Sequence, residues 1–104
     1  MSGTRVGFDS EAWQATAPGA RHKMAERAGK RLRLVEFATE FVEPDWCLKG
    51  HVGYLLAGEL ELEFEDRTER YRPGDAFVIR PGGADRHKAR ALGSTARLFL
   101  VEDA

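Results

Sequence analysis

Along most of this chain apolar and polar residues alternate, which is the pattern of a β-strand with one buried and one solvated face. The clearest example is residues 59–65, where a glutamate at every second position is separated by Leu60, Leu62 and Phe64. An α-helix would scatter these glutamates around its circumference, because its period is about 3.6 residues. The stretch is therefore predicted to be a strand whose glutamates form a solvated face.

Weaker versions of the same signal predict the remaining strands. Residues 51–57 (HVGYLLA) form a mostly apolar run that Gly58 ends in a turn or bulge. Residues 76–80 (AFVIR) form a short buried strand that is broken by Pro81-Gly82-Gly83. The other strands are expected at residues 31–41, 86–92 and 97–101.

Turn signals separate these strands, and little of the chain favours a helix. Arg72-Pro73-Gly74-Asp75 fits a type II turn, since proline fixes φ at the second position and glycine supplies a positive φ at the third. Residues 11–17 (EAWQATA) are expected to start a short helical turn, which Pro18-Gly19 would end. Many short strands with Gly/Pro turns predict an all-β fold, a sandwich or barrel of the jelly-roll kind.

Length and composition place limits on the class of protein. The chain of 104 residues has no repeat or linker, so we expect one domain, with residues 1–30 as an N-terminal strand or arm. It is 42% hydrophobic, and no apolar run approaches the ~20 residues of a membrane span. The first residues lack the apolar core of a signal peptide, and a single cysteine cannot form an internal disulfide. These features predict a cytoplasmic protein without a membrane segment.

Charge is small in total but unevenly distributed. The net charge is −1, with basic excesses in residues 1–35 and 67–104 and an acidic excess in residues 36–66. Acidic strands are therefore expected beside basic ones, where opposite charges favour pairing. The basic stretch at residues 21–33 lacks interleaved aromatic residues and precedes an acidic region, so we do not expect nucleic-acid binding.

Side chains that bind metals gather around the only cysteine, in PDWCLKGH (44–51). In a strand, Asp45 and Cys47 point to the same side about 6.6 Å apart. Residues 48–50 allow a tight connection, so His51 can open the next antiparallel strand opposite them. His87 follows the Gly-rich loop and can join from a third strand. Asp45, Cys47, His51 and His87 are therefore a candidate metal site of the tetrahedral zinc type.

Each of these residues also has an ordinary structural interpretation. A lone cysteine such as Cys47 is commonly an inert buried thiol. Asp45 suits a solvated turn before a strand, and His87 suits a loop histidine that caps one. His51 fits a site better, because Gly53 on the same face leaves space beside it. From the residues alone, both interpretations stay open.

The order of motifs resembles that of a small single-domain cupin, a core barrel over about residues 31–101. The first motif is Gly50-His51-x-Gly-Tyr-Leu-Leu-x-Gly58, followed by the Glu/Leu strand, and the second is PGDAFVIRPGG (73–83), followed by a histidine. The chain is most similar to a subgroup of small cupins with a Trp-Cys-x-x-Gly-His version of the first motif. This resemblance implies a cupin-type jelly-roll barrel with a metal site inside it.

The resemblance also implies ligand positions. The glutamate of the family pattern falls on His51, its pair of histidines on Asp45 and Cys47, and its last histidine on His87. Every departure from the usual histidine and glutamate set is another competent ligand rather than Val or Leu. The exchange toward sulfur favours zinc, with iron as the second choice.

We therefore expect a metal-binding cupin with a small-molecule pocket inside the barrel, although the fold hosts many reactions and the resemblance names none. The candidate pocket-lining residues are Gly53, Leu55, Phe77, Ile79 and Phe99. A first alternative is a non-catalytic small-ligand sensor or binding module. A second is a metal-free, redox-responsive dimeric barrel in which Cys47 reacts with oxidants.

A homodimer is expected for either kind of function. A barrel of this size buries little surface on its own. The N-terminal segment carries Phe8 and Trp13, which are candidates for packing across a second copy.

Overall fold

Seven strands and two short 3-10 turns make up the fold, seen in a computed structural model that describes residues 3–104. The turns are η1 (Phe8–Ser10) and η2 (Gly83–Asp85). Within residues 3–104 no helix has the length and apolar character needed to cross a membrane. The strands are β1 (Gln14–Ala17), β2 (Ala20–Arg27), β3 (Lys30–Phe37), β4 (His51–Phe64), β5 (Thr68–Tyr71), β6 (Ala76–Ile79) and β7 (His87–Asp103).

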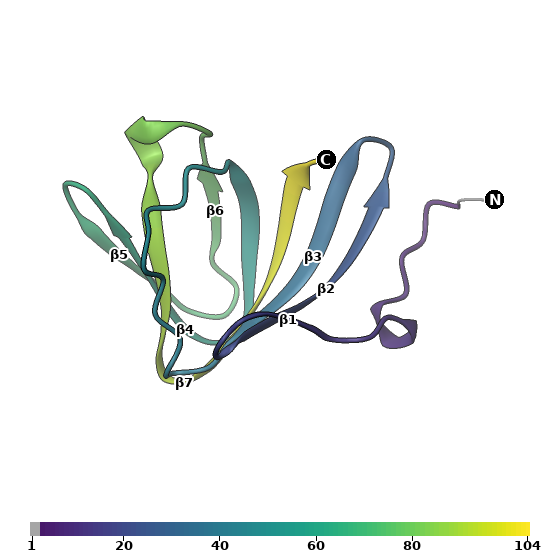
Figure 1. The fold of residues 1–104 in the computed structure, drawn as a ribbon, viewed down its shortest axis with the longest axis horizontal. Coiled ribbons are helices and arrows are strands. Elements are labelled where there is room, and N and C mark those ends of the chain that lie inside the picture. The colour runs from purple at the N-terminus through teal and green to yellow at the C-terminus, as the bar shows by residue number, and fades with distance from the viewer. Residues whose placement is uncertain (1–2) are drawn as a thin grey trace.

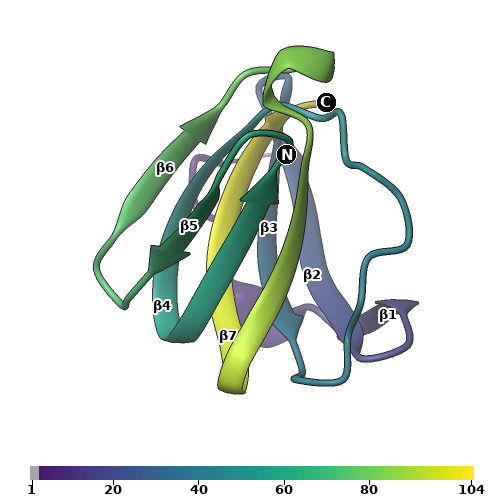
Figure 2. The same cartoon turned by 90° about the vertical axis from the view of Figure 1, so that its left-hand side faces the viewer.

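All strands pair antiparallel in one curved sheet, in the order β1-β2-β3-β7-β4-β5. β5 and β6 pair with different halves of the same edge of β4, while β7 follows its other edge. The sheet folds into a trough (Figure 1). One wall consists of β5 with the second half of β4 and the first half of β7, and the other consists of β2, β3 and β6 with the remaining halves of β4 and β7. β4 and β7 run side by side from one wall to the other (Figure 2). The all-β jelly-roll expectation is confirmed, although the strand pairing in residues 3–104 does not close into a complete ring.

A bulge at Gly58 lets β4 continue through the bend as one strand. The register between β4 and β7 shifts between Leu55 and Ala57 and again between Ala57 and Glu59. Gly58 has a φ of 78°, and a Cβ atom there would lie 2.3 Å from the carbonyl oxygen of Thr95. Only glycine satisfies both conditions, so the turn or bulge expected at this position is a bulge.

The elements differ from the sequence-based expectations in several places, and β5 is a strand where none was expected. Residues 14–17 form the exposed edge strand β1, which pairs with β2, instead of belonging to a helical turn. The strand expected over residues 31–41 ends at Phe37. The strands expected at 86–92 and 97–101 are two parts of β7, because the long strand β4 pairs with both of them.

The core lies on the inward side of β3, β4, β6 and β7. Leu60 and Leu62 are buried while Glu59 and Glu63 are exposed, as the alternation predicts. Glu61 pairs with Arg90 of β7 at 2.8 Å, so an acidic strand lies beside a basic one. The buried cluster consists of Val35, Leu55, Leu60, Leu62, Phe64, Phe77, Ile79, Ala89, Ala91, Ala96, Leu98 and Leu100.

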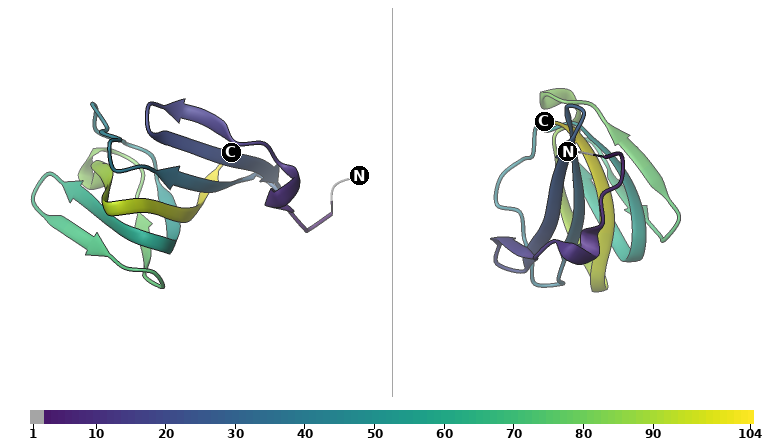
Figure 3. Two further views of the ribbon diagram at one scale, coloured as in Figure 1. Left: turned by 90° about the horizontal axis from the view of Figure 1, so that it is seen from below. Right: turned by 90° about the vertical axis from the view of Figure 1, so that its right-hand side faces the viewer.

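The N-terminal segment runs outside the β2–β3 hairpin (Figure 3). Phe8 packs edge-on against Phe99 of β7, with ring centroids 6.2 Å apart. Lys23 Nζ donates a hydrogen bond to the Phe8 carbonyl, and the Arg21 guanidinium lies 4.1 Å from the ring centroid of Trp13. Phe8 and Trp13 therefore already have partners within their own chain.

The bulge gives a matched test of backbone strain. Gly58→Ala should lower the free energy of unfolding by about 3 kcal/mol, because it combines left-handed strain with a clash against Thr95. Gly93→Ala is the control, since Gly93 has nearly the same φ, 77°, but a Cβ atom there would have no neighbouring atom within 4 Å. It should cost about 1 kcal/mol. Urea unfolding followed by tryptophan fluorescence measures both, and equal losses would contradict the clash.

Candidate metal centre

Cys47 is fixed by the backbone of the strand opposite it. Its N–H donates to the carbonyl of His87 at 2.8 Å, and the N–H of His87 donates back to the carbonyl of Cys47 at 3.1 Å. This isolated bridge holds the loop that precedes β4 against the first residue of β7. Cys47 and His87 therefore lie opposite each other on neighbouring backbone segments, which brings the thiol close to the His87 ring.

His51 is placed by the close approach of Gly50 to Pro81. A Cβ atom on Gly50 would lie 2.8 Å from Pro81 Cδ and 2.9 Å from Pro81 N. The absence of a side chain lets the chain pass the end of β6 at this distance. His51 then opens β4 opposite Ile79, with its side chain buried on the inward side.

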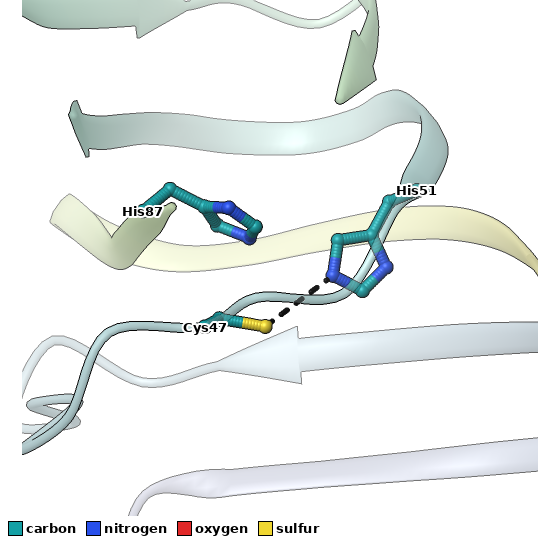
Figure 4. A group of neighbouring side chains, drawn as sticks. All are labelled: Cys47, His51 and His87. Carbon is teal, nitrogen blue, oxygen red and sulfur yellow. Dashed lines mark hydrogen bonds between the residues drawn. The ribbon is translucent and has the colours of Figure 1, made fainter. Parts of the chain in front are cut away.

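The three side chains converge from separate segments (Figure 4). Cys47 Sγ lies 3.7 Å from His51 Nε2, and the rings of His51 and His87 are 5.3 Å apart at their centroids. One ligand atom from each residue can be chosen so that all of them lie within 4.8 Å of one another. The histidines are buried and Cys47 is half-buried.

Contacts on the outer nitrogen of each ring turn the other nitrogen toward the thiol. His87 Nδ1 lies 3.0 Å from the carbonyl oxygen of Asp85, and a carbonyl only accepts, so Nδ1 carries the hydrogen. His51 Nδ1 lies 2.7 Å from Glu102 Oε2, where a hydrogen on Nδ1 avoids repulsion between two lone pairs. This contact is short enough for an ion pair, but its geometry is not that of a hydrogen bond. Among the described residues, His51 Nδ1 therefore has no hydrogen-bond partner.

Glu102 is itself held by two arginines of β3. Its Oε2 accepts a hydrogen bond from Arg33 Nη1 at 3.0 Å, and its Oε1 lies 3.8 Å from Arg31 Nη1. Arg33 Nε also donates to His22 Nδ1 at 2.9 Å. A connected row of polar side chains therefore leads from β2 through β3 and β7 to His51. Such outer partners fix the orientation of a ligating imidazole.

The histidines stabilise the thiolate form of Cys47. Hydrogen bonding to His51, and then to His87, lowers the pKa of the Cys47 thiol from 9.0 to about 5, against the opposing effect of burial. Burial lowers the pKa of His87, but its contacts with Cys47 and Asp85 outweigh burial and the net shift is upward. A negative sulfur between two imidazole rings is therefore the favoured state at neutral pH.

A cavity of about 330 Å³ opens beside the three side chains. Its polar lining includes Arg33, Glu43 and Lys49. Glu43 Oε1 accepts a hydrogen bond from the backbone N–H of Ala89 at 2.8 Å. Burial is the main cause that raises the pKa of Glu43 above its ordinary value, and the charge of the nearby Cys47 acts in the same direction. The apolar lining includes Phe37, Phe41, Leu62, Phe77, Ile79, Leu98 and Leu100.

Not all of the expected site residues meet. Cys47, His51 and His87 come together, whereas Asp45 is exposed and lies outside the group. Its loop has no regular strand geometry, so the alternation that placed Asp45 beside Cys47 does not apply. Glu43 faces the cavity instead.

The expected pocket lining is partly corrected. Phe77 and Ile79 line the cavity, but Leu55 is fully buried in the core. Gly53 leaves room for the ring of Phe77, whose Cζ would lie 2.2 Å from a Cβ atom on Gly53. Phe99 points to the outer face, because Leu98 and Leu100 take the inward positions of β7.

Sequence reasoning did not single out Arg33, Glu43 or Glu102. In β7 every second residue, Leu98, Leu100 and then Glu102, faces inward, so the alternation could have placed Glu102 on the inner face. Arg33 likewise alternates with outward Leu32 and Leu34. Glu43 lies in a loop and has no such signal.

The donor set fits a divalent metal ion. In a tetrahedral zinc site, bond lengths of about 2.3 Å to sulfur and about 2.05 Å to nitrogen separate these two atoms by about 3.6 Å. The distance between Cys47 Sγ and His51 Nε2 is 3.7 Å. Cys47, His51 and His87 would supply three of the four ligands of such a site, and all three line the cavity.

Comparison with known proteins supports the same interpretation of the fold. The family model of the cupin domain matches residues 49–102, which is more than half of the chain. The chain belongs to the cupin domain family. The family-model match thus includes His51 and His87 and begins shortly after Cys47. Comparison with curated proteins gives no match.

Solved cupin-fold structures resemble the chain over most of its length. KdgF from Halomonas sp. is 28% identical, with a TM-score of 0.79 over 99% of this chain and 96% of that protein. The polyketide cyclase RemF from Streptomyces resistomycificus is 25% identical, with a TM-score of 0.77 over 98% of this chain and 80% of that protein. A cupin-2 domain protein from Shewanella frigidimarina is 23% identical, with a TM-score of 0.66 over 80% and 79% of the two chains. The last of these shows the fold alone.

The geometry around Cys47 predicts an acidic thiol in this cupin. The rate at which iodoacetamide alkylates chelator-treated protein should rise with pH, with its midpoint at the Cys47 pKa of about 5, because His51 and His87 stabilise the thiolate. His51→Ala should move this midpoint toward the ordinary range, and Arg72→Gln, in the exposed turn between β5 and β6, should leave it near its original value. The chain has a single cysteine, so the rate reports Cys47 alone. A wild-type midpoint near 9 would contradict the hydrogen bonding described here.

Proposed function

We propose that this cupin binds a divalent metal ion through Cys47, His51 and His87 and holds a small molecule in the adjoining cavity. The observation that carries the proposal is the convergence of three ligand atoms within 4.8 Å, with His87 Nδ1 bonded to the Asp85 carbonyl and His51 Nδ1 2.7 Å from Glu102. Sulfur in the ligand set favours zinc, with iron second. Because a thiolate ligand must stay reduced, we place the protein, as one domain, in the cytoplasm.

The chain's own residues set the chemistry that is available. A bound divalent ion with an open position polarises a carbonyl or hydroxyl oxygen, or lowers the pKa of a water molecule. Glu102 and Asp85 hold the two imidazole rings, and the aromatic and aliphatic walls exclude water from the cavity. The RemF relative is a polyketide cyclase, but the fold hosts many reactions, so the proposal extends to binding and activation of a small molecule rather than to one reaction.

Metal content tests the proposal directly. Protein purified without chelator or nickel resin should carry about one equivalent of zinc or iron by elemental analysis. The double variant Cys47→Ala/His51→Ala should carry none, because it loses two of the three ligands. Asp45→Asn is the matched control and should keep the metal, since Asp45 lies outside the group.

Two other results would favour the alternative functions. Absence of metal together with rapid oxidation of Cys47 by peroxide would favour a redox-responsive barrel, which the low pKa of the thiol makes chemically feasible. Absence of metal together with thermal stabilisation by a small molecule would favour a sensor. Either result would contradict the metal-binding proposal.

We also propose that the protein is a homodimer, joined through the outer face of β4 and β6. Val52, Tyr54 and Leu56 of β4 and Val78 of β6 are exposed on this face, with Val78 76% exposed. Val52 and Val78 pair directly across the two strands, so the side chains form one apolar surface. Exposed apolar surfaces of this kind mark interfaces. The neighbouring part of the face is already covered by Phe8.

A single charge on this face should separate the subunits. Val78→Glu should shift the protein from dimer to monomer in sedimentation equilibrium, because the carboxylate would be desolvated at the interface. Val42→Glu is the control, since Val42 is 75% exposed in the loop after β3, away from this face. A wild-type monomer, or a Val78→Glu variant that remains dimeric, would contradict the proposed interface.

A further inference from the structure

A lysine stands where two cavities of the molecule adjoin. Lys49 lines the cavity beside the three ligands and also a second cavity, of about 500 Å³, at the mouth of the trough. His51 and Ile79 are the other residues shared by the two linings. In the chain, Lys49 lies between Cys47 and His51, and the thiolate is also bonded by the Lys49 backbone N–H. Lys49 therefore lies at the junction of the two cavities, beside the ligand cluster.

Lys49 differs from the other cations around the entrance in having no carboxylate partner. Lys30 pairs with Asp103 at 2.7 Å, and Arg31 pairs with Glu26 at 3.2 Å. Among residues 3–104, no carboxylate oxygen lies within the 4.0 Å limit of an ion pair with Lys49.

A second cation, Arg33, lies deeper in the same cavity. Its side chain is only 17% exposed, and it uses Nε for His22 and Nη1 for Glu102. The hydrogen bonds that Arg33 makes within residues 3–104 do not use Nη2. A guanidinium that lines a cavity and has one nitrogen outside its hydrogen bonds is a common recognition element for carboxylates.

With a divalent ion bound, the charges around the cavity would favour an anion. Among the described residues its lining contains the cations Lys49 and Arg33, of which Arg33 is paired with Glu102, and two acidic groups, Glu43 and the Cys47 thiol. A divalent ion bound by one thiolate and two neutral imidazoles adds one further positive charge to this balance. The apolar walls around Phe77 and Leu98 would in turn require the ligand to have an apolar body.

From this arrangement we infer that the ligand of the cavity is a small organic acid with an apolar body, whose carboxylate is bound by Lys49 and Arg33. The inference rests on the proposed function in that the metal ion would hold an oxygen of the same molecule. Lys49 and Arg33 act through charge and hydrogen bonds that do not depend on the metal. The preference of the cavity for an acid over a neutral analogue therefore comes from these two residues and does not require the metal.

The test compares 3-phenyllactate with its neutral amide, which has the same apolar body. Isothermal titration of zinc-loaded protein should show binding of the acid at least about tenfold tighter than the amide, as expected for one charge-assisted hydrogen bond in a partly buried site. Lys49→Gln should remove most of this preference. Arg72→Gln is the control, because it removes one exposed positive charge from the β5–β6 turn and should leave the preference unchanged.

The same titration on chelator-treated protein separates this inference from the metal proposal. The acid should bind more weakly there but should still exceed the amide, since Lys49 and Arg33 remain in place. Failure to load zinc with the preference intact overturns only the metal proposal. Equal binding of acid and amide, or a preference that survives Lys49→Gln, overturns the organic-acid inference. Inorganic phosphate binding as tightly as 3-phenyllactate would also overturn it, because the site would then be a general anion site.

Discussion

The bend in the β4–β7 ladder is the constraint on which the candidate site depends. His51 begins β4, and His87 pairs with Phe64 at the other end of the same ladder. A straight β4 would separate these ends by about 40 Å, at about 3.3 Å per residue. The two imidazole rings are instead 5.3 Å apart, because the sheet folds back on itself. The bulge at Gly58 lies in the middle of this path, so a residue far from the cluster in sequence makes the cluster possible.

Local contacts then align the groups that the bend brings together. The backbone bridge between Cys47 and His87 fixes the position of the thiol, and the close approach of Gly50 to Pro81 fixes the start of β4. Glu102 and the Asp85 carbonyl occupy the outer ring nitrogens, so both Nε2 atoms are left for the centre. Each histidine is thus oriented by a partner outside the cluster, and the arginines of β3 hold one of those partners in turn.

The sequence predicted a site residue correctly where a motif sets that residue at a fixed spacing from glycines that the backbone requires. Gly50 and His51 are adjacent in a frame that Gly58 completes, so the position of His51 followed from spacing. Residues 98–101 are all apolar, so alternation could not show that Leu98 and Leu100 face inward and Phe99 outward. Asp45 and Glu43 lie in a loop, where side-chain direction depends on tertiary contacts such as the hydrogen bond from Ala89 to Glu43.

The thiolate explains how a cluster of this kind can exist before metal arrives. A buried thiol would have to lose its proton on metal binding, which makes affinity depend on pH. Here two imidazoles lower the pKa of Cys47 to about 5, so the sulfur is already ionised at neutral pH. A ring that keeps its Nδ1 hydrogen and also bonds the sulfur through Nε2–H is an imidazolium, so its positive charge stabilises the thiolate in the space that a metal cation would occupy. A divalent ion held by these residues would displace the Nε2 hydrogens to solvent as protons, and the 3.7 Å separation of Cys47 Sγ and His51 Nε2 already suits such an ion.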